Sequence, residues 1–558
     1  MDTSKILKWA VVLGGFLCYF LADGCTYSAG ILFTEFKDIF NASATATSLL
    51  PALIYAIPQF MSPLICPVTN SVGYSTAAAW GSVFLCLSFI VTSFAQEIGI
   101  TYFAYGVLMS LGLQLTYTSA FMAVCATFKD SKWFGLACGI MTCGGGIGAF
   151  VTNHMLIWVL SLWTWRETLV IQGGFFLHAW ISAAIFYWSD ERGAIEKETA
   201  RYEAYYEEGE QFDDVKVSVE PSIDCSEPTV EVDQPKRSCC SRLVDQLKNL
   251  WCLCPLIMIF TPVQQRPRAR PSEYSMLGSE KDSRSQWKEF RQQLKESFSC
   301  LFTKSVWTNA PFLIYVLTNG MAAASVVIPW TFVYDYVRSG WLLGLDLNTE
   351  LNSVAETQLA WYPSLIGLGS CAGQILFGLL ISKVHNPTEV TNKRKVNSLM
   401  CVFAMVLFMN GAMTLVFTFA PLPTYLGSLG VSGAETVGLF STTVGSVFAA
   451  ICFFLGMTDG AFMTILGPML ELFLNETNFP AGLGISLFCT GAFNLAGTLL
   501  GGHMLDAFGS YYSANLFAAA LSLNGFVVFV IFCLVYYRGG KESDQTSIDT
   551  TEAQTHRS

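Results

Sequence analysis

Long apolar runs alternate with shorter polar segments along almost the whole chain. A helix of about 20 apolar residues is long enough to cross the hydrocarbon core of a bilayer. The runs therefore predict twelve transmembrane helices, at residues 9–33, 46–68, 74–95, 98–128, 133–160, 168–188, 305–336, 357–384, 396–419, 438–474, 479–504 and 512–537.

The longest polar segment falls between the sixth and seventh runs. It divides the predicted all-α membrane protein into a six-helix bundle at 1–188, a cytoplasmic and largely disordered linker at 189–304, a second six-helix bundle at 305–537 and a cytoplasmic tail at 538–558. Hydrophobic residues make up 53% of the chain and charged residues only 13%, whereas a soluble protein carries about 25% charged residues. No basic patch interleaved with aromatics indicates a nucleic-acid partner.

Basic residues gather on one side of the predicted helices. By the positive-inside rule that side is the cytoplasm, so both termini and the linker are expected there. The basic residues concerned are Lys5, Lys8, Lys129, Lys132, Lys383, Lys393, Arg394, Lys395, Arg538 and Lys541. The opposite loops carry Glu97, Asp335, Asp346, Glu350, Glu356 and Glu435, with Arg338 as the exception. Asn41, in Asn41-Ala42-Ser43, is then a glycosylation acceptor on the outside, whereas Asn475 lies in a cytoplasmic loop.

Asp23 stands in the middle of the first apolar run. A carboxylate at that depth costs about 2.5–3.5 kcal/mol on insertion scales, so it is expected to face a partner or a water-filled cavity. Gly24 is expected to loosen the helix beside it. Asp23 is therefore a candidate for substrate binding and for coupling or gating. The alternative is a carboxylate that caps backbone amides at a helix break. A cleaved signal peptide is not expected, because the run continues to Phe33.

Traces of an internal repeat accompany the arrangement of six spans, linker and six spans. Gly135-Leu136-Ala137 and Gly482-Leu483-Gly484 open the fifth and eleventh spans at corresponding places. Together with the layout they point to a major facilitator fold, with spans 1, 4, 7 and 10 lining a central cavity. The glycines at 144–146 are interpreted as a close-packing helix surface, since no lysine–serine pair follows them as in a phosphate-binding loop.

A second carboxylate, Asp459, lies in span 10 and is a candidate for substrate binding and coupling, with a structural role as the alternative. Two carboxylates without an evident buried cation suit a cationic or zwitterionic substrate, or proton coupling. The other candidate substrate-binding groups at cavity depth are Tyr27, Ser28, Tyr117, Asn319 and Asn494. Hydrogen bonding between helices is an equally good explanation for each of them.

The remaining ionisable residues of the spans favour structural roles. His154 and His178 are expected to bond neighbouring helices. Arg166 is expected to anchor a loop or to pair with Glu167, with a coupling or gating role as the alternative.

No cofactor, metal site or disulfide framework is expected. None of the 18 cysteines falls in a predicted outer loop. Cys239, Cys240, Cys252 and Cys254 in the linker are interpreted as free thiols, with palmitoylation next to a short apolar patch as the alternative.

Several segments resemble the monocarboxylate transporter family, in particular its invertebrate and orphan branches. They are Asp23-Gly24-Cys25-Thr26-Tyr27 in span 1, Phe128-Lys129-Asp130-Ser131-Lys132 before span 5, Trp165-Arg166-Glu167 before span 6, and Asp506-Ala507-Phe508-Gly509-Ser510-Tyr511 after span 11. The resemblance implies a major facilitator fold and a multi-pass plasma-membrane carrier for monocarboxylates. Asp506 is expected to brace a cytoplasmic turn, with a part in coupling or gating.

The chain departs from that family where the family's lactate carriers hold their charged groups. The lysine of their span 1 aligns with Tyr27, and the aspartate and arginine of their span 8 align with Ser370 and Gln374. These three neutral residues are candidates for substrate binding, but they argue against proton–lactate symport.

The resulting interpretation is a secondary transporter, not an enzyme, that moves a small monocarboxylate or a carboxylate-bearing metabolite. A carrier for zwitterionic or cationic solutes, such as aromatic amino acids or amines, and a transport-dead receptor or scaffold of the same fold are the alternatives. The resemblance leaves open whether protons are coupled and whether a single-span glycoprotein chaperone is needed.

Overall fold

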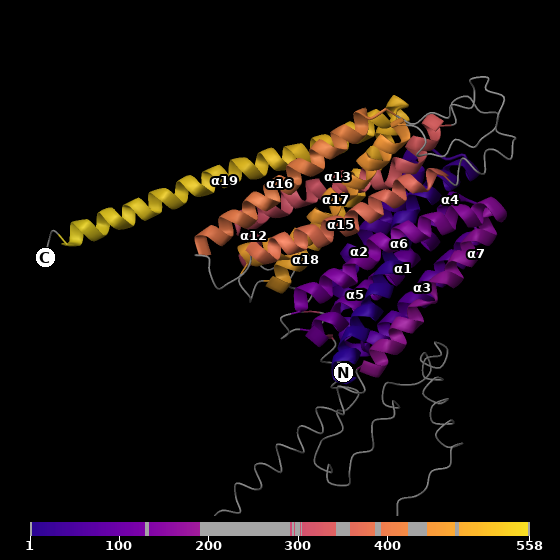
Figure 1. Ribbon diagram of the computed structural model, residues 1–558, viewed down its shortest axis with the longest axis horizontal. Helices are drawn as coiled ribbons and strands as arrows, with labels where there is room; N and C mark the ends of the chain where they lie inside the picture. The colour runs from indigo at the N-terminus through magenta and orange to yellow at the C-terminus, as the bar shows by residue number, and fades with distance from the viewer. Residues whose placement is uncertain are drawn as a thin grey trace, which may run out of the picture. The chain divides into compact units, whose positions relative to one another are not determined.

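The computed structural model describes residues 3–128, 133–189, 291–292, 295, 302, 304–341, 358–384, 392–421, 443–474 and 479–555. Over these residues the regular structure is entirely helical (Figure 1). The helices are α1 (Thr3–Ile39), α2 (Ala44–Val72), α3 (Tyr74–Ser93), α4 (Ile98–Thr101), the π-helix η1 (Tyr102–Leu108), α5 (Met109–Phe128), α6 (Phe134–Leu162), α7 (Trp165–Phe176), α12 (Lys304–Trp307), α13 (Ala310–Trp341), α15 (Trp361–Val384), α16 (Asn392–Phe419), α17 (Thr443–Phe473), α18 (Phe479–Phe508) and α19 (Tyr511–Thr555).

Twelve segments of the described chain are long and apolar enough to cross a membrane, which confirms the predicted number. The fourth, Ile98–Phe128, joins α4, η1 and α5, and the sixth, Trp165–Ser189, joins α7 to helical residues 179–189. The helix α19 continues to Thr555, past the end of its span at Val535.

The chain divides into two compact units, one of residues 1–183 and 282–558 and one of residues 184–281. All but the first six residues of the second unit lie outside the described chain. The predicted linker and its cysteines are therefore almost wholly outside it, as is Asn475. Both sets of six spans belong mainly to the first unit.

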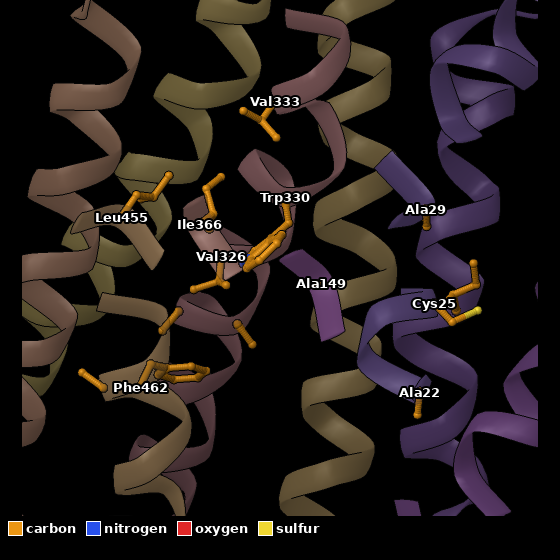
Figure 2. Packing of buried hydrophobic residues seen from close by; sticks show 14 of the residues in the cluster. Ala22, Cys25, Ala29, Ala149, Val326, Trp330, Val333, Ile366, Leu455 and Phe462 are labelled. Carbon is orange, nitrogen blue, oxygen red and sulfur yellow. The ribbon is translucent and has the colours of Figure 1, made fainter. Parts of the chain in front are cut away.

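Apolar side chains from the first six and the last six spans form one continuous core in the first unit. Ala22, Cys25 and Ala29 follow one face of α1, and Val326, Trp330 and Val333 follow one face of α13 (Figure 2). Spacings of three or four residues place side chains on the same face of a helix. The small residues on α1 let neighbouring helices approach closely, which is how membrane helices gain packing energy in lipid.

Glycines of α6 bring this helix into close contact with α1 and α15. A methyl group added at Gly148 would lie 2.0 Å from the carbonyl oxygen of Phe20 on α1, and one at Gly144 would lie 2.3 Å from that of Phe16. Gly146 faces the other way, with its added methyl group 2.4 Å from the carbonyl oxygen of Gly367 on α15. The α6 glycines therefore form a close-packing surface, as the sequence indicated.

Two helix pairs join the first six spans to the last six: α2 packs along α18, and α6 packs along α15. A third contact, between α1 and α13, runs from Tyr27 and Trp330 to the ion pairs at the ends of both helices. These helices belong to opposite halves, so any relative movement of the halves must slide or separate these three contacts.

The structure corrects one expectation about the first span and removes the alternative given for Asp23. The helix α1 is continuous from Thr3 to Ile39, so Gly24 does not interrupt it. Gly24 instead lies against α6, where an added methyl group would be 2.4 Å from Thr152 Oγ1. Asp23 therefore has no helix break to cap, and its side chain bonds a tyrosine on α5.

The end of the bundle opposite the N-terminus, formed by residues 33–46, 328–341 and 502–514, is called the distal end below. Asp335 and Arg338 belong to the last turns of α13 at this end. The positive-inside argument had placed both residues in a loop. Asp506 also lies at the distal end, because it bonds the first residues of α2. Its turn therefore cannot share the side of the N-terminus, which corrects the expectation of a cytoplasmic turn.

Glycine packing gives a first prediction. Gly148→Ala should lower the melting temperature of the purified protein, because the added carbon would collide with the α1 backbone. Gly139→Ala on the same helix is the matched control, since nothing lies within 4 Å of its added carbon. A helical glycine-to-alanine change without a clash stabilises by about 0.5–1 kcal/mol. Equal melting temperatures for the two variants would contradict the packing described.

Glycosylation tests the membrane orientation. Asn41 is exposed in the turn between α1 and α2 at the distal end. If both termini are cytoplasmic, this turn is outside, and an endoglycosidase should shift the mass of the wild type but not of Asn41→Gln. A glycan on Asn475 would reverse the orientation.

Candidate functional site

Asp23 projects from α1 toward α5. It is half-buried, and the Tyr117 hydroxyl donates a hydrogen bond to its Oδ1. The Tyr117 oxygen also lies 3.2 Å from Thr26 Oγ1, one turn along α1. The carboxylate therefore has one strong donor and keeps part of its surface open.

A glycine makes room for this carboxylate. A methyl group added at Gly145 of α6 would lie 2.0 Å from Asp23 Oδ2. The α6 glycines thus both bring α1 close and leave space for its one buried charge.

Asp459 lies on α17 and is 1% exposed. Ser370 Oγ of α15 donates a hydrogen bond of 2.9 Å to Asp459 Oδ2, while Oδ1 has no hydrogen-bond partner. The Trp330 indole of α13 interacts with this carboxylate, but its Nε1 does not complete a hydrogen bond. Leaving a buried polar atom unpaired costs about 1–3 kcal/mol, so the arrangement is typical of a site that a ligand or a proton completes.

An aromatic pair links α1 and α13 next to the two carboxylates. The rings of Tyr27 on α1 and Trp330 on α13 are stacked with centroids 4.0 Å apart and an interplanar angle of 27°. Both Asp23 and Asp459 are close enough to Tyr27 to affect it electrostatically, and they also affect each other. Tyr27 lies one turn after Asp23 on α1, and Trp330 interacts with Asp459, so the stack connects two acidic groups, one from each half.

The site is acidic and lacks a compensating cation within the described chain. Among the described residues, no Lys or Arg forms an ion pair with either carboxylate; Lys37 pairs with Asp335, and Arg338 pairs with Asp38. Tyr55 of α2 also belongs here, since both carboxylates act on it, and its hydroxyl lies next to Thr331 of α13. Two neutral donors, the Tyr55 hydroxyl and the Trp330 indole N–H, therefore accompany the two acids.

Of the other candidate binding residues, some lie next to Asp459 and the rest bond elsewhere or have an unpaired oxygen. Ser370 and Gln374 lie on α15 next to α17, and Gln374 Oε1 is buried without a partner. Ser28 is fully buried and directed at Gln172 of α7, 3.5 Å away, so it is not part of this site. Asn319 bonds Thr490 of α18 at 3.1 Å, which matches the alternative of hydrogen bonding between helices. Asn494 is 4% exposed, and its Oδ1 has no partner.

Arg166 and the histidines lie away from the carboxylates. The guanidinium of Arg166 donates to the Ser93 carbonyl and lies 4.3 Å from the Trp165 ring centroid. The neighbouring Glu167 forms a capping box with Thr164 and does not pair with Arg166. His154 lies 3.1 Å from Ser364 Oγ of α15, and His178 bonds the Phe175 carbonyl of its own helix.

Sequence reasoning missed Trp330 and Tyr55. Both are aromatic residues within apolar runs, where nothing in the residue type separates a site residue from a core residue. Only the expectation that span 7 faces the cavity could have singled out Trp330.

Comparison with known proteins decides the family. A model of the Major Facilitator Superfamily matches residues 15–443. The chain belongs to this superfamily. It is therefore a multi-pass membrane transporter, as the sequence predicted, and the all-α fold with twelve spans is confirmed.

Curated relatives are similar over a smaller part of the chain. Monocarboxylate transporter 12 of Mus musculus is 29% identical over 177 residues, which are 32% of this chain and 36% of that protein. Monocarboxylate transporter 13 of Rattus norvegicus is 28% identical over 170 residues, 30% of this chain and 39% of that protein. The match thus spans little more than a third of each relative. It supports the resemblance to monocarboxylate transporters.

Solved structures agree on the fold alone. A mutant of the nucleoside transporter NupG has a TM-score of 0.55 and 11% identity, covering 94% of this chain and 99% of that one. A mutant of the peptide transporter POT, in complex with sulfate, has a TM-score of 0.54 and 12% identity, covering 97% of this chain and 99% of that one.

The site predicts that Asp23 is needed for transport but not for folding. In Asp23→Asn the amide oxygen still accepts from Tyr117, and no charge is desolvated, so the melting temperature should be unchanged or higher. Uptake should fall to background. Ser28→Ala, on the same helix but away from the site, should keep uptake within about twofold, since it removes only one hydroxyl that the site does not use. Wild-type uptake by a well-expressed Asp23→Asn variant would remove Asp23 from the site.

Proposed function

We propose that the chain is a secondary transporter that moves a small carboxylate-bearing metabolite by alternating access. The observation that carries this proposal is the Tyr27–Trp330 stack, which joins the two halves and links Asp23 on α1 to Asp459 on α17. A site built from both halves is completed or opened when the halves move, which is the requirement for alternating access in this fold.

The charge of the site favours a substrate with a positive group. Two carboxylates without a neighbouring cation repel each other, and an ammonium or guanidinium between them would relieve that repulsion. The stacked aromatic pair adds a further attraction for a cation or a planar group.

The carboxylate of such a substrate needs hydrogen-bond donors, in contrast to its positive group, which the acids bind. The Tyr55 hydroxyl, next to Thr331, and the Trp330 indole N–H, next to Asp459, are neutral donors beside the two acids. Neutral donors of this kind can hold a carboxylate without a lysine or arginine. The substrate class proposed is therefore a larger or zwitterionic carboxylate, such as an aromatic amino acid, with lactate a poor substrate.

The site residues proposed for binding are Asp23, Tyr27, Tyr55, Tyr117, Trp330, Ser370, Gln374 and Asp459, and Asn494 of α18 is a further candidate. The carrier is proposed to act in the plasma membrane with both termini cytoplasmic, in line with the positive-inside rule. The proposal requires neither a coupled proton nor a single-span glycoprotein partner. Uptake at two pH values, with and without such a partner co-expressed, decides both points.

A transport-dead receptor or scaffold is the competing function, because the long segment at 189–304 could bind partners. Deletion of this segment separates the two. A carrier keeps its flux without the segment, whereas a receptor signals without any flux.

The proposed function is tested by uptake into oocytes that express the full chain. Uptake of an aromatic amino acid should exceed that of lactate by about tenfold or more, which corresponds to about 1.4 kcal/mol of selectivity. It should change little between about pH 6 and 7.5, because neither carboxylate must change its charge to hold a substrate that carries its own cation. Robust electroneutral proton–lactate cotransport would contradict the proposal.

A further inference from the structure

The turn at residues 506–511 resembles a family motif, but the binding site does not include it. Asp506, at the end of α18, accepts hydrogen bonds from the backbone N–H groups of Ala44 at 2.8 Å and Thr45 at 2.7 Å, and from the Thr45 hydroxyl. These residues begin α2. The first N–H groups of a helix have no partner within the helix and carry its positive dipole end, so a carboxylate binds them well.

The other end of the turn makes a second contact. The Tyr511 hydroxyl donates to Asp335 on α13, and the same carboxylate forms an ion pair with Lys37 of α1. Asp335 is 5% exposed, so water screens this pair little. A second ion pair, between Arg338 Nη1 and Asp38 Oδ2 at 2.6 Å, lies one turn further along α13.

These contacts cross between the halves of the transporter. Asp506, Tyr511 and Asp335 belong to the last six spans, whereas Lys37 and the start of α2 belong to the first six. Gly509, with φ of +63°, turns the chain sharply between α18 and α19, and this conformation suits glycine. One short turn therefore contacts α2 of the other half directly and α1 of that half through Asp335.

We propose that the turn from Asp506 to Tyr511 is a clamp that holds the distal end shut in the conformation described here. Asp506 holds α2, and Tyr511 positions Asp335 for its ion pair with Lys37. This inference rests on the alternating-access function proposed above, because a clamp matters only if the distal end also opens. Asp506 and Tyr511 are positioning residues, and neither is placed in the substrate site.

Hydrogen–deuterium exchange of the purified full chain tests the clamp without any substrate. In Asp506→Ala and in Tyr511→Phe, amides of residues 33–50 and 328–341 should exchange about tenfold faster, or more, because opening of this end becomes easier. Ser513→Ala is the matched control. Its hydroxyl bonds only Met504 and Ser510 within the same half, so exchange should stay at the wild-type rate.

The range of the effect decides the interpretation. Faster exchange confined to the first residues of α2 in Asp506→Ala, with residues 328–341 unchanged, would show a local helix cap and overturn the clamp. Swapping the two charged residues at positions 37 and 335 controls for variants that simply fold badly. Lys37→Asp and Asp335→Lys alone should each speed exchange, and the double variant should restore slower exchange. Failure of the double variant to recover would also overturn the proposal.

The result is separable from the proposed function. If exchange responds as expected but no solute is taken up, the clamp stands and the substrate proposal fails. If uptake is found but exchange does not respond, the clamp fails and the carrier function stands.

Discussion

Close backbone contact at glycines is the constraint on which the rest of this structure depends. Gly144 and Gly148 hold α6 against α1, and Gly145 between them leaves room for the Asp23 carboxylate. On the other half, an added methyl group at Gly460 would lie 2.0 Å from the Ser370 carbonyl oxygen, so α15 and α17 are held equally close. That contact brings Ser370 within hydrogen-bonding distance of Asp459. Helix packing thus places both carboxylates before any substrate is considered.

The same packing explains how the site differs from what the resemblance to monocarboxylate transporters implied. Ser370 occupies the position that aligns with a charged residue in the family's lactate carriers, but the Asp459 carboxylate of the adjacent helix bonds it. A negative group is therefore present at this position, supplied by span 10 instead of span 8. The aligned cations are not replaced within the described chain, since Tyr27 and Gln374 are neutral. The site thus has carboxylates and neutral groups at these positions, which is the physical basis for proposing a substrate that carries its own cation.

The sequence was sufficient for the twelve spans, because the length of an apolar run is a local property that can be read from residue types. Asp23, Tyr117 and Asp459 could be named as candidates from residue type and depth, and their roles stay proposals. The sequence was not sufficient for Ser28, whose direction depends on the rotation of α1, or for Trp330, which looks like any aromatic in an apolar run. Asp335 and Arg338 were wrongly assigned to a loop, because their partners on α1 are distant in the sequence: Arg338 and Asp38 are 300 positions apart. Contacts between distant helices set these outcomes, and no short segment of sequence encodes them.

The central claim is that an acidic site shared by the two halves binds a positive group. It is tested most directly by the thermal stabilisation of the purified full chain by three matched ligands: an aromatic amino acid, the amine that lacks its carboxylate, and the acid that lacks its amine. Binding to the folded state raises stability in proportion to RT ln(1 + [L]/Kd). The account predicts a higher melting temperature with the amino acid, a smaller rise with the amine, no rise with the acid, and loss of both rises in Asp459→Asn. Stabilisation by the amine-free acid alone, unchanged in Asp459→Asn, would contradict it.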